Sequence, residues 1–525
     1  MSALPCPVAN PFAAANQDYA AITEFLSSKE AWQVDHSELE RALEGMGRDL
    51  LRKLLQAHLD LRQPGQAVEA VREAAGTPLE PTAVHRRSVE SIFGTVELVR
   101  TGYGAAGTAS VHPLDGALNL PPEKYTLEVR RRVAVEAAKS SFEEGLQTLE
   151  MYTGAHVPKR QFEELVKRAA QDFEAFYAQR QAGAGADPPT GSILVLTVDG
   201  KGVVMRPEDL REATQRAAAA RAKTFTARLG SGGRLHAKRM ACVAAIYTVE
   251  PFVRTPEEIL PESRRQETGP ARPRPEHKRV WASLAQSPEE VIGEMFEEAA
   301  RRDPQRHKRW VALVDGNLVQ IAHLEQLAEQ WGIALIIVVD FIHVAQYGWK
   351  AAGALFPNQE VEQDRWTREH LLEILRGKAS RVAAGMRRSA TLRQMGAERK
   401  PVDECADYLL PYSPYLQYDK ALAEGIPIAT GVIEGACRHL VEDRMNLTGA
   451  RWSLTGAEAV LRLRALRSSN DFDAYWKFHE QQEYERHHAS RYADHRVPDT
   501  VPHAPASSQR SRPSKLKLVS KKGES

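Results

Sequence analysis

The chain has few cysteines and almost no net charge. Its four cysteines, Cys6, Cys242, Cys405 and Cys437, are scattered over 525 residues with no close pair. Such spacing argues against a disulfide framework and against a zinc finger or zinc ribbon. The formal net charge is +1, so the protein is not a polycation, and any surface for nucleic acid must be a local patch.

Long apolar runs are also missing, and no leader sequence is expected. No stretch approaches the roughly 20 apolar residues that are needed to span a bilayer. The N-terminus, Met-Ser-Ala-Leu-Pro-Cys-Pro, has no basic segment followed by an apolar one, so no secretory signal is expected. The charged fraction of 26% and the hydrophobic fraction of 42% are ordinary for a globular protein. We expect a soluble, cytoplasmic protein, and the length favours about two to four domains.

The first part of the chain predicts helices followed by a hairpin. Apolar residues recur at three- and four-residue steps between about 18 and 75, which is typical of helices, and we take residues 1–85 as a helical N-terminal region. Residues 88–100 alternate between apolar and polar and break at Gly94-Thr95. This pattern predicts a β-hairpin.

Residues 86–180 are a candidate DNA-binding domain. After the hairpin, a helix over 141–152 stops at Thr153-Gly154, and the next helix opens with Lys159 and Arg160. This is the outline of a helix-turn-helix, whose second helix reads DNA. A small helical bundle fits the same pattern, and acidic residues in the second helix weaken the DNA-reading interpretation.

The rest of the chain predicts an α/β domain with a mixed sheet, following a linker at 181–191 that is rich in Gly, Ala and Pro. The expected order is three strands, helix, strand, helix, strand, over residues 193–205, 240–249, 279–284, 287–302, 309–314, 321–331 and 334–339. Residues 344–424 predict an all-α insertion between two parts of this domain, 191–343 and 425–486. Residues 487–525 predict a disordered basic tail.

Three of the predicted strands end in aspartate, namely Asp199, Asp315 and Asp340. Acids at the exits of strands lie where open α/β sheets place their chemistry. Two or three such carboxylates, with one from a helix such as Glu434, can hold Mg²⁺ or Mn²⁺, because these ions prefer oxygen ligands. Two ions roughly 3.5–4 Å apart would activate one oxygen and stabilise the leaving oxygen in phosphoryl transfer.

Each of these residues also has a structural interpretation. Asp199-Gly200 and Asp315-Gly316 are strong hairpin-turn signals. Asp340 could cap the helix that starts after it. Glu434 could be an ordinary helical residue, and His343 could be a packed or hydrogen-bonded histidine. Their joint occurrence is what favours a site.

Four motifs together resemble the ordered motifs of DDE transposases. They are Val198-Asp199-Gly200-Lys201-Gly202-Val203, Val314-Asp315-Gly316, Asp340-Phe341-Ile342-His343 and Gly431-Val432-Ile433-Glu434-Gly435. The chain most resembles bacterial insertion-sequence transposases of the ISKra type, with kinship to the Mutator-like group, over roughly residues 85–470. The resemblance implies an RNase H-like catalytic domain interrupted by an α-helical insertion, which agrees with the predicted strand order.

The resemblance implies that Asp199 is the first catalytic and metal-binding aspartate and that Glu434 is the catalytic glutamate. Two residues compete for the middle position. Asp315 follows the fourth strand, where the RNase H order puts the second acid. Asp340 and His343 match a separate Asp/Cys-x-x-His element of Mutator-like relatives. We favour Asp315 as the metal ligand, with Asp340 and His343 as supporting residues, and the reverse assignment stays open.

The resemblance further implies an enzyme with two Mg²⁺ or Mn²⁺ ions that cleaves transposon ends and transfers strands to target DNA. It would act on double-stranded DNA as a homodimer or larger assembly, at the bacterial nucleoid. Lys159, Arg160, Arg438 and Arg451 are candidate DNA contacts, since a guanidinium forks onto phosphate oxygens. Ion pairing at the surface or between helices is the alternative for Arg438 and Arg451. Trp452 could stack on a base or belong to the core.

Two other functions share parts of this pattern. An RNase H-like nuclease or junction resolvase would use the same acids without a separate end-binding domain. A domesticated DNA-binding protein would keep the fold without transposition activity. All the expected acids are present, which argues against a loss of catalysis. The chain lacks the N-terminal zinc element with paired cysteines that many relatives carry, so recognition of DNA ends would rest on residues before 180.

Overall fold

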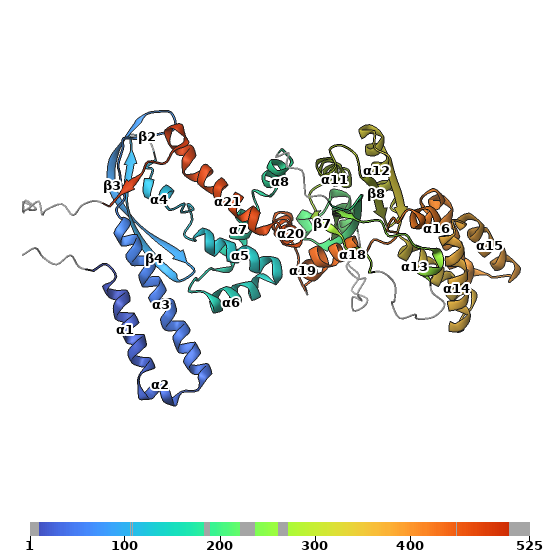
Figure 1. Ribbon diagram of the computed structural model, residues 1–525, viewed down its shortest axis with the longest axis horizontal. Coiled ribbons are helices and arrows are strands. Elements are labelled where there is room, and N and C mark those ends of the chain that lie inside the picture. The colour runs from blue at the N-terminus through green and yellow to red at the C-terminus, as the bar shows by residue number, and fades with distance from the viewer. Residues whose placement is uncertain are drawn as a thin grey trace, which may run out of the picture. The chain divides into compact units, whose positions relative to one another are not determined.

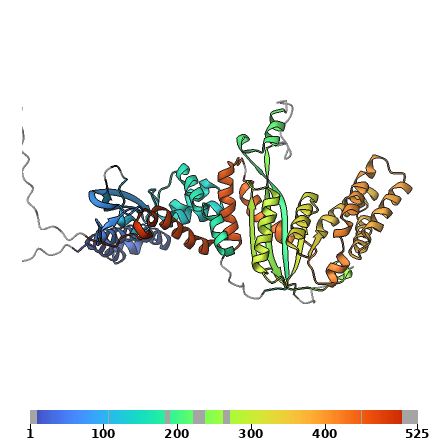
Figure 2. The same ribbon diagram turned by 90° about the horizontal axis from the view of Figure 1, so that it is seen from above.

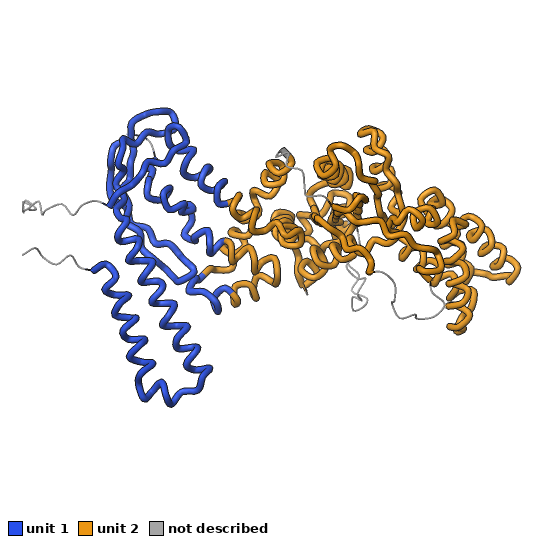
Figure 3. Tube along the Cα trace, viewed as in Figure 1, with its two compact units in different colours: residues 1–130, 149–156, 480–525 blue, residues 131–148, 157–479 orange. Residues whose placement is uncertain are grey.

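The computed structural model describes residues 10–105, 107, 109–182, 190–220, 237–260, 271–447 and 449–502. The chain divides into two compact units (Figure 3), unit 1 with residues 1–130, 149–156 and 480–525, and unit 2 with residues 131–148 and 157–479. Most of the predicted linker at 181–191 lies outside the described residues. Among the described helices, none combines the length and the apolar character that a membrane crossing requires.

Unit 1 begins with the helices α1 (Ala13–Leu26), α2 (Lys29–Gln33) and α3 (His36–Arg62). The Asp35 carboxylate starts α3 by accepting a hydrogen bond from the Glu38 amide at 2.8 Å. The helical pattern was expected to reach about residue 75, but α3 ends at Arg62. The segment that follows instead forms the short strands β1 (Gln66–Ala67) and β2 (Val71–Arg72).

The predicted hairpin is confirmed. Strands β3 (Pro78–Ser91) and β4 (Gly94–Gly104) pair in antiparallel fashion, with Ser91 opposite Gly94, and β2 pairs with β3 on the other side. Gly94 has φ +112°, a backbone conformation that side chains with a Cβ rarely adopt. The sequence break at Gly94 therefore marks the end of the turn.

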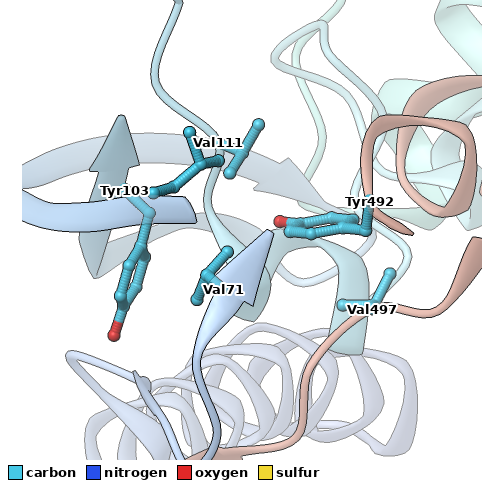
Figure 4. Packing of buried hydrophobic residues seen from close by; sticks show 6 residues of the cluster. Val71, Tyr103, Val111, Tyr492 and Val497 are labelled. Atoms are coloured by element: carbon cyan, nitrogen blue, oxygen red, sulfur yellow. The ribbon is translucent and has the colours of Figure 1, made fainter. Parts of the chain in front are cut away.

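The segment after residue 487 differs from the expected disordered tail. Strand β10 (Thr500–Val501) pairs with β1, and Tyr492 and Val497 are buried in one cluster with Val71, Tyr103 and Val111 (Figure 4). The prediction was wrong here because isolated apolar residues in a polar segment produce no periodic pattern. Residues 503–525 lie outside the described residues.

Unit 2 contains a five-stranded mixed sheet, as the predicted α/β class requires. Its strands are β5 (Ile193–Val204), β6 (Lys238–Val249), β7 (Glu276–Ser283), β8 (Arg309–Val314) and β9 (Leu335–Val339). Their order is β7-β6-β5-β8-β9; β6 is antiparallel to β5 and β7, whereas β5, β8 and β9 are parallel. Residues Ile193–Val198 are all buried, so both faces of the central strand β5 are covered.

Helices α11 (Pro288–Arg302) and α12 (Leu318–Trp331) connect the later strands and pack on the sheet. The predicted start of α11 is confirmed, because Ser287 and Glu290 form a reciprocal capping box with Pro288 at the first helical position. Two shorter helices lie between the earlier strands in the sequence: α9 (Glu212–Ala220) between β5 and β6, and α10 (Pro256–Ile259) between β6 and β7.

Five helices separate β9 from the last part of the sheet domain, where an all-α insertion was expected. They are α13 (Phe341–Leu355), α14 (Glu360–Leu375), α15 (Ala379–Leu392), α16 (Lys400–Tyr412) and α17 (Tyr418–Ala423). They lie together beside the sheet (Figures 1 and 2). The two ends of this insertion are joined, because the Phe341 amide donates to the Ile428 carbonyl at 2.9 Å.

The remaining helices lie on either side of the sheet domain in the sequence. Before β5 come α4 (Pro113–Ala117), α5 (Leu127–Lys139), α6 (Phe142–Tyr152), α7 (Lys159–Ala169) and α8 (Phe173–Ala182). After the insertion come α18 (Gly431–Ala436), the π-helical turn η4 (Cys437–Glu442), α19 (Asp443–Met445), α20 (Leu454–Ser468) and α21 (Phe472–His487). The helix predicted over 141–152 is confirmed as α6, and the helix predicted to open with Lys159 and Arg160 is confirmed as α7.

Replacing Tyr492 with alanine tests whether the C-terminal segment belongs to the core of unit 1. Tyr492 is 3% exposed, so we expect Tyr492→Ala to lower the free energy of unfolding of unit 1 by about 3–5 kcal/mol. Urea denaturation of the full chain measures the change. Val84→Ala is the control, because Val84 is 56% exposed and its loss should cost no more than about 0.5 kcal/mol. Equal stability of the two variants would contradict the assignment.

Candidate active site

The three predicted strand-end aspartates lie side by side across the sheet. Val198 of β5 is in register with Val314 of β8, and Val314 is in register with Val339 of β9. Asp199, Asp315 and Asp340 are the next residues on these three parallel strands. The ladder reaches as far as Asp340, whose amide donates to the Val314 carbonyl at 2.8 Å. We call these three residues the aspartate row.

The two Asp-Gly pairs of the row behave differently. Asp199-Gly200 lies inside β5, which continues to Val204 and stays paired with β6, so the hairpin-turn interpretation is wrong at this position. Asp315-Gly316 does form a turn at the end of β8. There the Asn317 amide donates to Asp315 Oδ1 at 3.1 Å, and Gly316 has φ +97°.

Asp340 caps the start of α13, as its structural interpretation predicts. It is fully buried, and its Oδ1 accepts a hydrogen bond from the Ile342 amide at 2.8 Å. Its Oδ2 accepts a hydrogen bond from the Thr430 hydroxyl. Since both oxygens already have donors and neither is exposed, this carboxylate is poorly suited to bind a metal ion.

Asp199 and Asp315 are more exposed than Asp340, and their negative charges repel each other. Burial raises the pKa of the Asp315 carboxyl above its ordinary value, and the neighbouring Asp199 carboxylate raises it further. Asp199 Oδ1 accepts from the Gly200 amide at 2.6 Å, and its Oδ2 accepts from the Cys437 thiol at 3.2 Å. A divalent cation that prefers oxygen ligands would relieve this repulsion, so the donor set fits Mg²⁺ or Mn²⁺.

Helix α18 carries Glu434 to the same region. The helix packs against β5 and β6, and Glu434 is exposed. The Cys437 thiol donates to Asp199. Glu434 lies three residues before Cys437, so Glu434 and Cys437 are neighbours on the helix surface. Among the described residues, however, Asp199, Asp315 and Glu434 do not all lie within 4.8 Å of one another. Asp199 and Asp315 are thus neighbours on the sheet, and Glu434 lies on the helix that packs beside them, without a closed cluster of the three acids.

His343 faces the buried Asp340. Its Nδ1 lies 3.7 Å from Asp340 Oδ2, an ion-pair distance that is too long for a hydrogen bond. The interaction with Asp340 raises the pKa of His343, and the charges of Asp315 and Asp199 raise it further against the opposing effect of burial. The imidazole is therefore predisposed to carry a positive charge beside the aspartate row.

The four basic residues predicted to contact DNA are all exposed. Lys159 and Arg160 open α7; Lys159 Nζ lies 3.3 Å from Glu143 Oε2. Arg438 lies in η4. Its Nε is 3.8 Å from Asp443 Oδ1, a long ion pair that agrees with the alternative interpretation of surface ion pairing. Arg451 precedes Trp452. Nothing in these positions tests DNA binding, and the four contacts stay predictions.

Trp452 belongs to the core. It is buried, its Nε1 donates to the Met445 carbonyl at 3.1 Å, and its ring meets the Phe142 ring edge-on with centroids 5.8 Å apart. The core interpretation is therefore confirmed, and stacking on a base is excluded for this conformation.

Four residues at the site were not singled out by the sequence. Thr430 and Cys437 contact the aspartate row from either end of α18, and the hydroxyls of Tyr408 and Tyr412 bind the backbone of the Asp315 turn. Thr430 and Cys437 flank the Gly-Val-Ile-Glu-Gly motif, which could have drawn attention to them. The tyrosines recur at three- and four-residue steps in the insertion, a pattern that indicates a shared helix face but no partner.

Comparison with known proteins assigns no family. No protein-family model matches the chain, and no curated protein matches it significantly. The function is therefore inferred from the geometry of the site and from the motifs.

The raised pKa of His343 predicts a pH-dependent contribution to stability. A group whose pKa is raised on folding contributes fully below its unfolded pKa of about 6.5, and the contribution is lost as pH rises through the folded value. Wild type should therefore exceed His343→Gln in stability at low pH, and the difference should shrink as pH rises. Urea denaturation between about pH 5 and pH 8 measures it.

The control for this prediction is the same comparison in an Asp340→Asn background. Asparagine keeps the shape of the side chain but removes the charge that raises the pKa of His343. The pH dependence of the His343→Gln effect should then weaken. An unchanged pH dependence would contradict the ion pair between His343 and Asp340.

Proposed function

We propose that unit 2 is an RNase H-like, metal-dependent polynucleotidyl transferase. The sheet order supports this class, because three antiparallel strands are followed by two that extend the sheet in parallel with β5. The observation that carries the proposal is the aspartate row on β5, β8 and β9, together with Glu434 on the first helix after an all-α insertion.

Within this class, we propose a DDE transposase of the insertion-sequence type. The motifs around Asp199, Asp315 and Glu434 resemble those of that family, and each lies where the proposed fold needs an acid. The exposed basic residues Lys159, Arg160, Arg438 and Arg451 would contact the phosphates of transposon ends and target DNA. Two ends must be joined to one target, so the active form would be a dimer or larger.

Asp199, Asp315 and Glu434 would hold two Mg²⁺ or Mn²⁺ ions. When bound, such ions activate an attacking oxygen and stabilise the leaving oxygen at phosphorus. The choice of Asp315 over Asp340 is supported by burial, because Asp340 is fully buried with both oxygens hydrogen-bonded, whereas Asp315 is partly exposed. Asp340 would instead help to position α18, the helix that carries Glu434, because its partner Thr430 immediately precedes that helix.

Hydrogen bonds orient the proposed ligands. The Gly200 amide and the Cys437 thiol fix the two oxygens of Asp199, and the Asn317 amide fixes Oδ1 of Asp315. Glu434 is exposed, so its side chain is free to turn toward the strand ends when a cation is present. The positive charge favoured on His343 would face the phosphate backbone near the row.

A second candidate is an RNase H-like nuclease or resolvase, which would use the same acids. A domesticated DNA-binding protein is the non-enzymatic alternative. The motif set around the acids favours the transposase. The three functions separate in one assay, because only a transposase joins an element end to a target.

Strand transfer of a labelled element end with Mg²⁺ tests the proposal. We expect Asp199→Ala, Asp315→Ala and Glu434→Ala each to lower the rate more than about a hundredfold, since even outer residues around a metal cost 10- to 100-fold. Asp340→Asn should retain measurable transfer, because the asparagine oxygen can still accept from the Ile342 amide while its NH₂ group donates to the Thr430 hydroxyl oxygen.

Asp403→Asn is the control variant for the transfer assay. Asp403 pairs with Arg399 within the insertion at 2.9 Å and should tolerate the change. Activity in Asp315→Ala together with none in Asp340→Asn would reverse the assignment of the second ligand. Cleavage without joining would favour the nuclease, and binding of ends without either reaction would favour the DNA-binding protein.

A further inference from the structure

The turn that carries Asp315 is held by the helical insertion. Tyr408 and Tyr412 lie one turn apart on α16, so they share one face of that helix. The Tyr408 hydroxyl donates to the Asp315 carbonyl at 2.9 Å, and the Tyr412 hydroxyl donates to the Gly316 carbonyl. Two phenols from a segment about 90 residues away thus bind two consecutive carbonyls of this turn.

The turn is shaped to receive these phenols. A Cβ at position 316 would lie 2.8 Å from the Tyr408 hydroxyl oxygen, closer than real contacts allow. Gly316 also has φ +97°, where other residues are strained. Glycine is therefore needed for both the backbone path and the approach of Tyr408.

The ring of Tyr408 is itself fixed. Tyr347 of α13 stacks on it with ring centroids 4.2 Å apart and planes 16° apart. Helix α13 begins directly after Asp340, and the buried Tyr418 donates to the Val339 carbonyl at 2.7 Å. The insertion therefore reaches the ends of both β8 and β9, and the hydroxyl of Tyr408 has little freedom to leave its acceptor.

We propose that Tyr408 and Tyr412 are positioning residues that set the Asp315 carboxylate for metal binding. This inference rests on the proposed function, because it takes Asp315 as a ligand. The insertion would then do more than cover DNA or fill space. It would fix the backbone from which one metal ligand projects, while the Asn317 amide fixes that ligand's side chain.

Burial supports the donor role of Tyr408. Burial raises the pKa of its hydroxyl well above the ordinary value, and the nearby tyrosines and acids raise it further. The phenol therefore keeps its proton at neutral pH. Phenylalanine at the same position would keep the ring and its stacking while removing only the donated hydrogen bond.

Binding of Mn²⁺ without DNA tests the proposal in the full chain. Free Mn²⁺ is followed by its electron paramagnetic resonance signal, and thermal unfolding confirms that each variant is folded. We expect the Mn²⁺ concentration at half-saturation to rise about three- to tenfold in the double variant Tyr408→Phe/Tyr412→Phe, the scale of one or two ordinary hydrogen bonds. Raised Mn²⁺ should restore its strand transfer, because only ligand placement has changed.

The matched control is Tyr415→Phe. Tyr415 follows α16 closely, but its hydroxyl donates to the Glu325 side chain at 2.6 Å and does not contact the turn. The Mn²⁺ concentration at half-saturation of Tyr415→Phe should equal that of the wild-type protein. Gly316→Ala provides a second, independent perturbation of the turn and should weaken Mn²⁺ binding in the same direction.

The outcomes separate this inference from the proposed function. If wild type binds Mn²⁺, Asp315→Asn does not, and the double variant binds as well as wild type, the positioning role is overturned and the transposase proposal stands. If the wild-type protein binds no Mn²⁺, or binds it equally well after Asp315→Asn, the proposed function fails. The positioning role then fails with it.

Discussion

The site depends on the register of three parallel strands. Hydrogen bonds between β5, β8 and β9 put Val198, Val314 and Val339 on one line across the sheet, and the residue after each of them is an aspartate. A slip of one residue in either ladder would move an acid along its strand and turn its side chain to the other face. Burial of Ile193–Val198 in β5 and of the residues of β8 after Arg309 helps to fix this register, because a shifted strand would lose its packing.

Given that register, hydrogen bonding divides the work among the acids. Asp340 is saturated by the Ile342 amide and the Thr430 hydroxyl, so it is a structural residue that ties the end of β9 to the start of α18. Asp199 and Asp315 are partly exposed, and their charges repel each other, which contributes to the raised pKa of Asp315. The mutual repulsion is what makes this pair suited to a divalent cation.

The insertion is bound to the site through backbone groups. Its first residue pairs with Ile428 near its far end, and its tyrosines donate to carbonyls at the ends of β8 and β9. Carbonyl acceptors are present at every residue, so these contacts leave no trace in the sequence of the turn except at Gly316. For this reason the aspartates could be predicted from their strands, whereas the roles of Tyr408 and Tyr412 could not.

The sequence by itself determined the main elements of the sheet domain and their order. Apolar runs located all five strands of the large sheet, the capping residues located α11, and the alternation around Gly94 located the hairpin, because each is a local pattern of burial or backbone freedom. Only the tertiary structure decided which of Asp315 and Asp340 keeps a free oxygen. It also showed that Asp199-Gly200 is strand, that Trp452 is core and that Tyr492 folds into unit 1. These outcomes depend on partners far away in the chain, and local patterns carry no information about such partners.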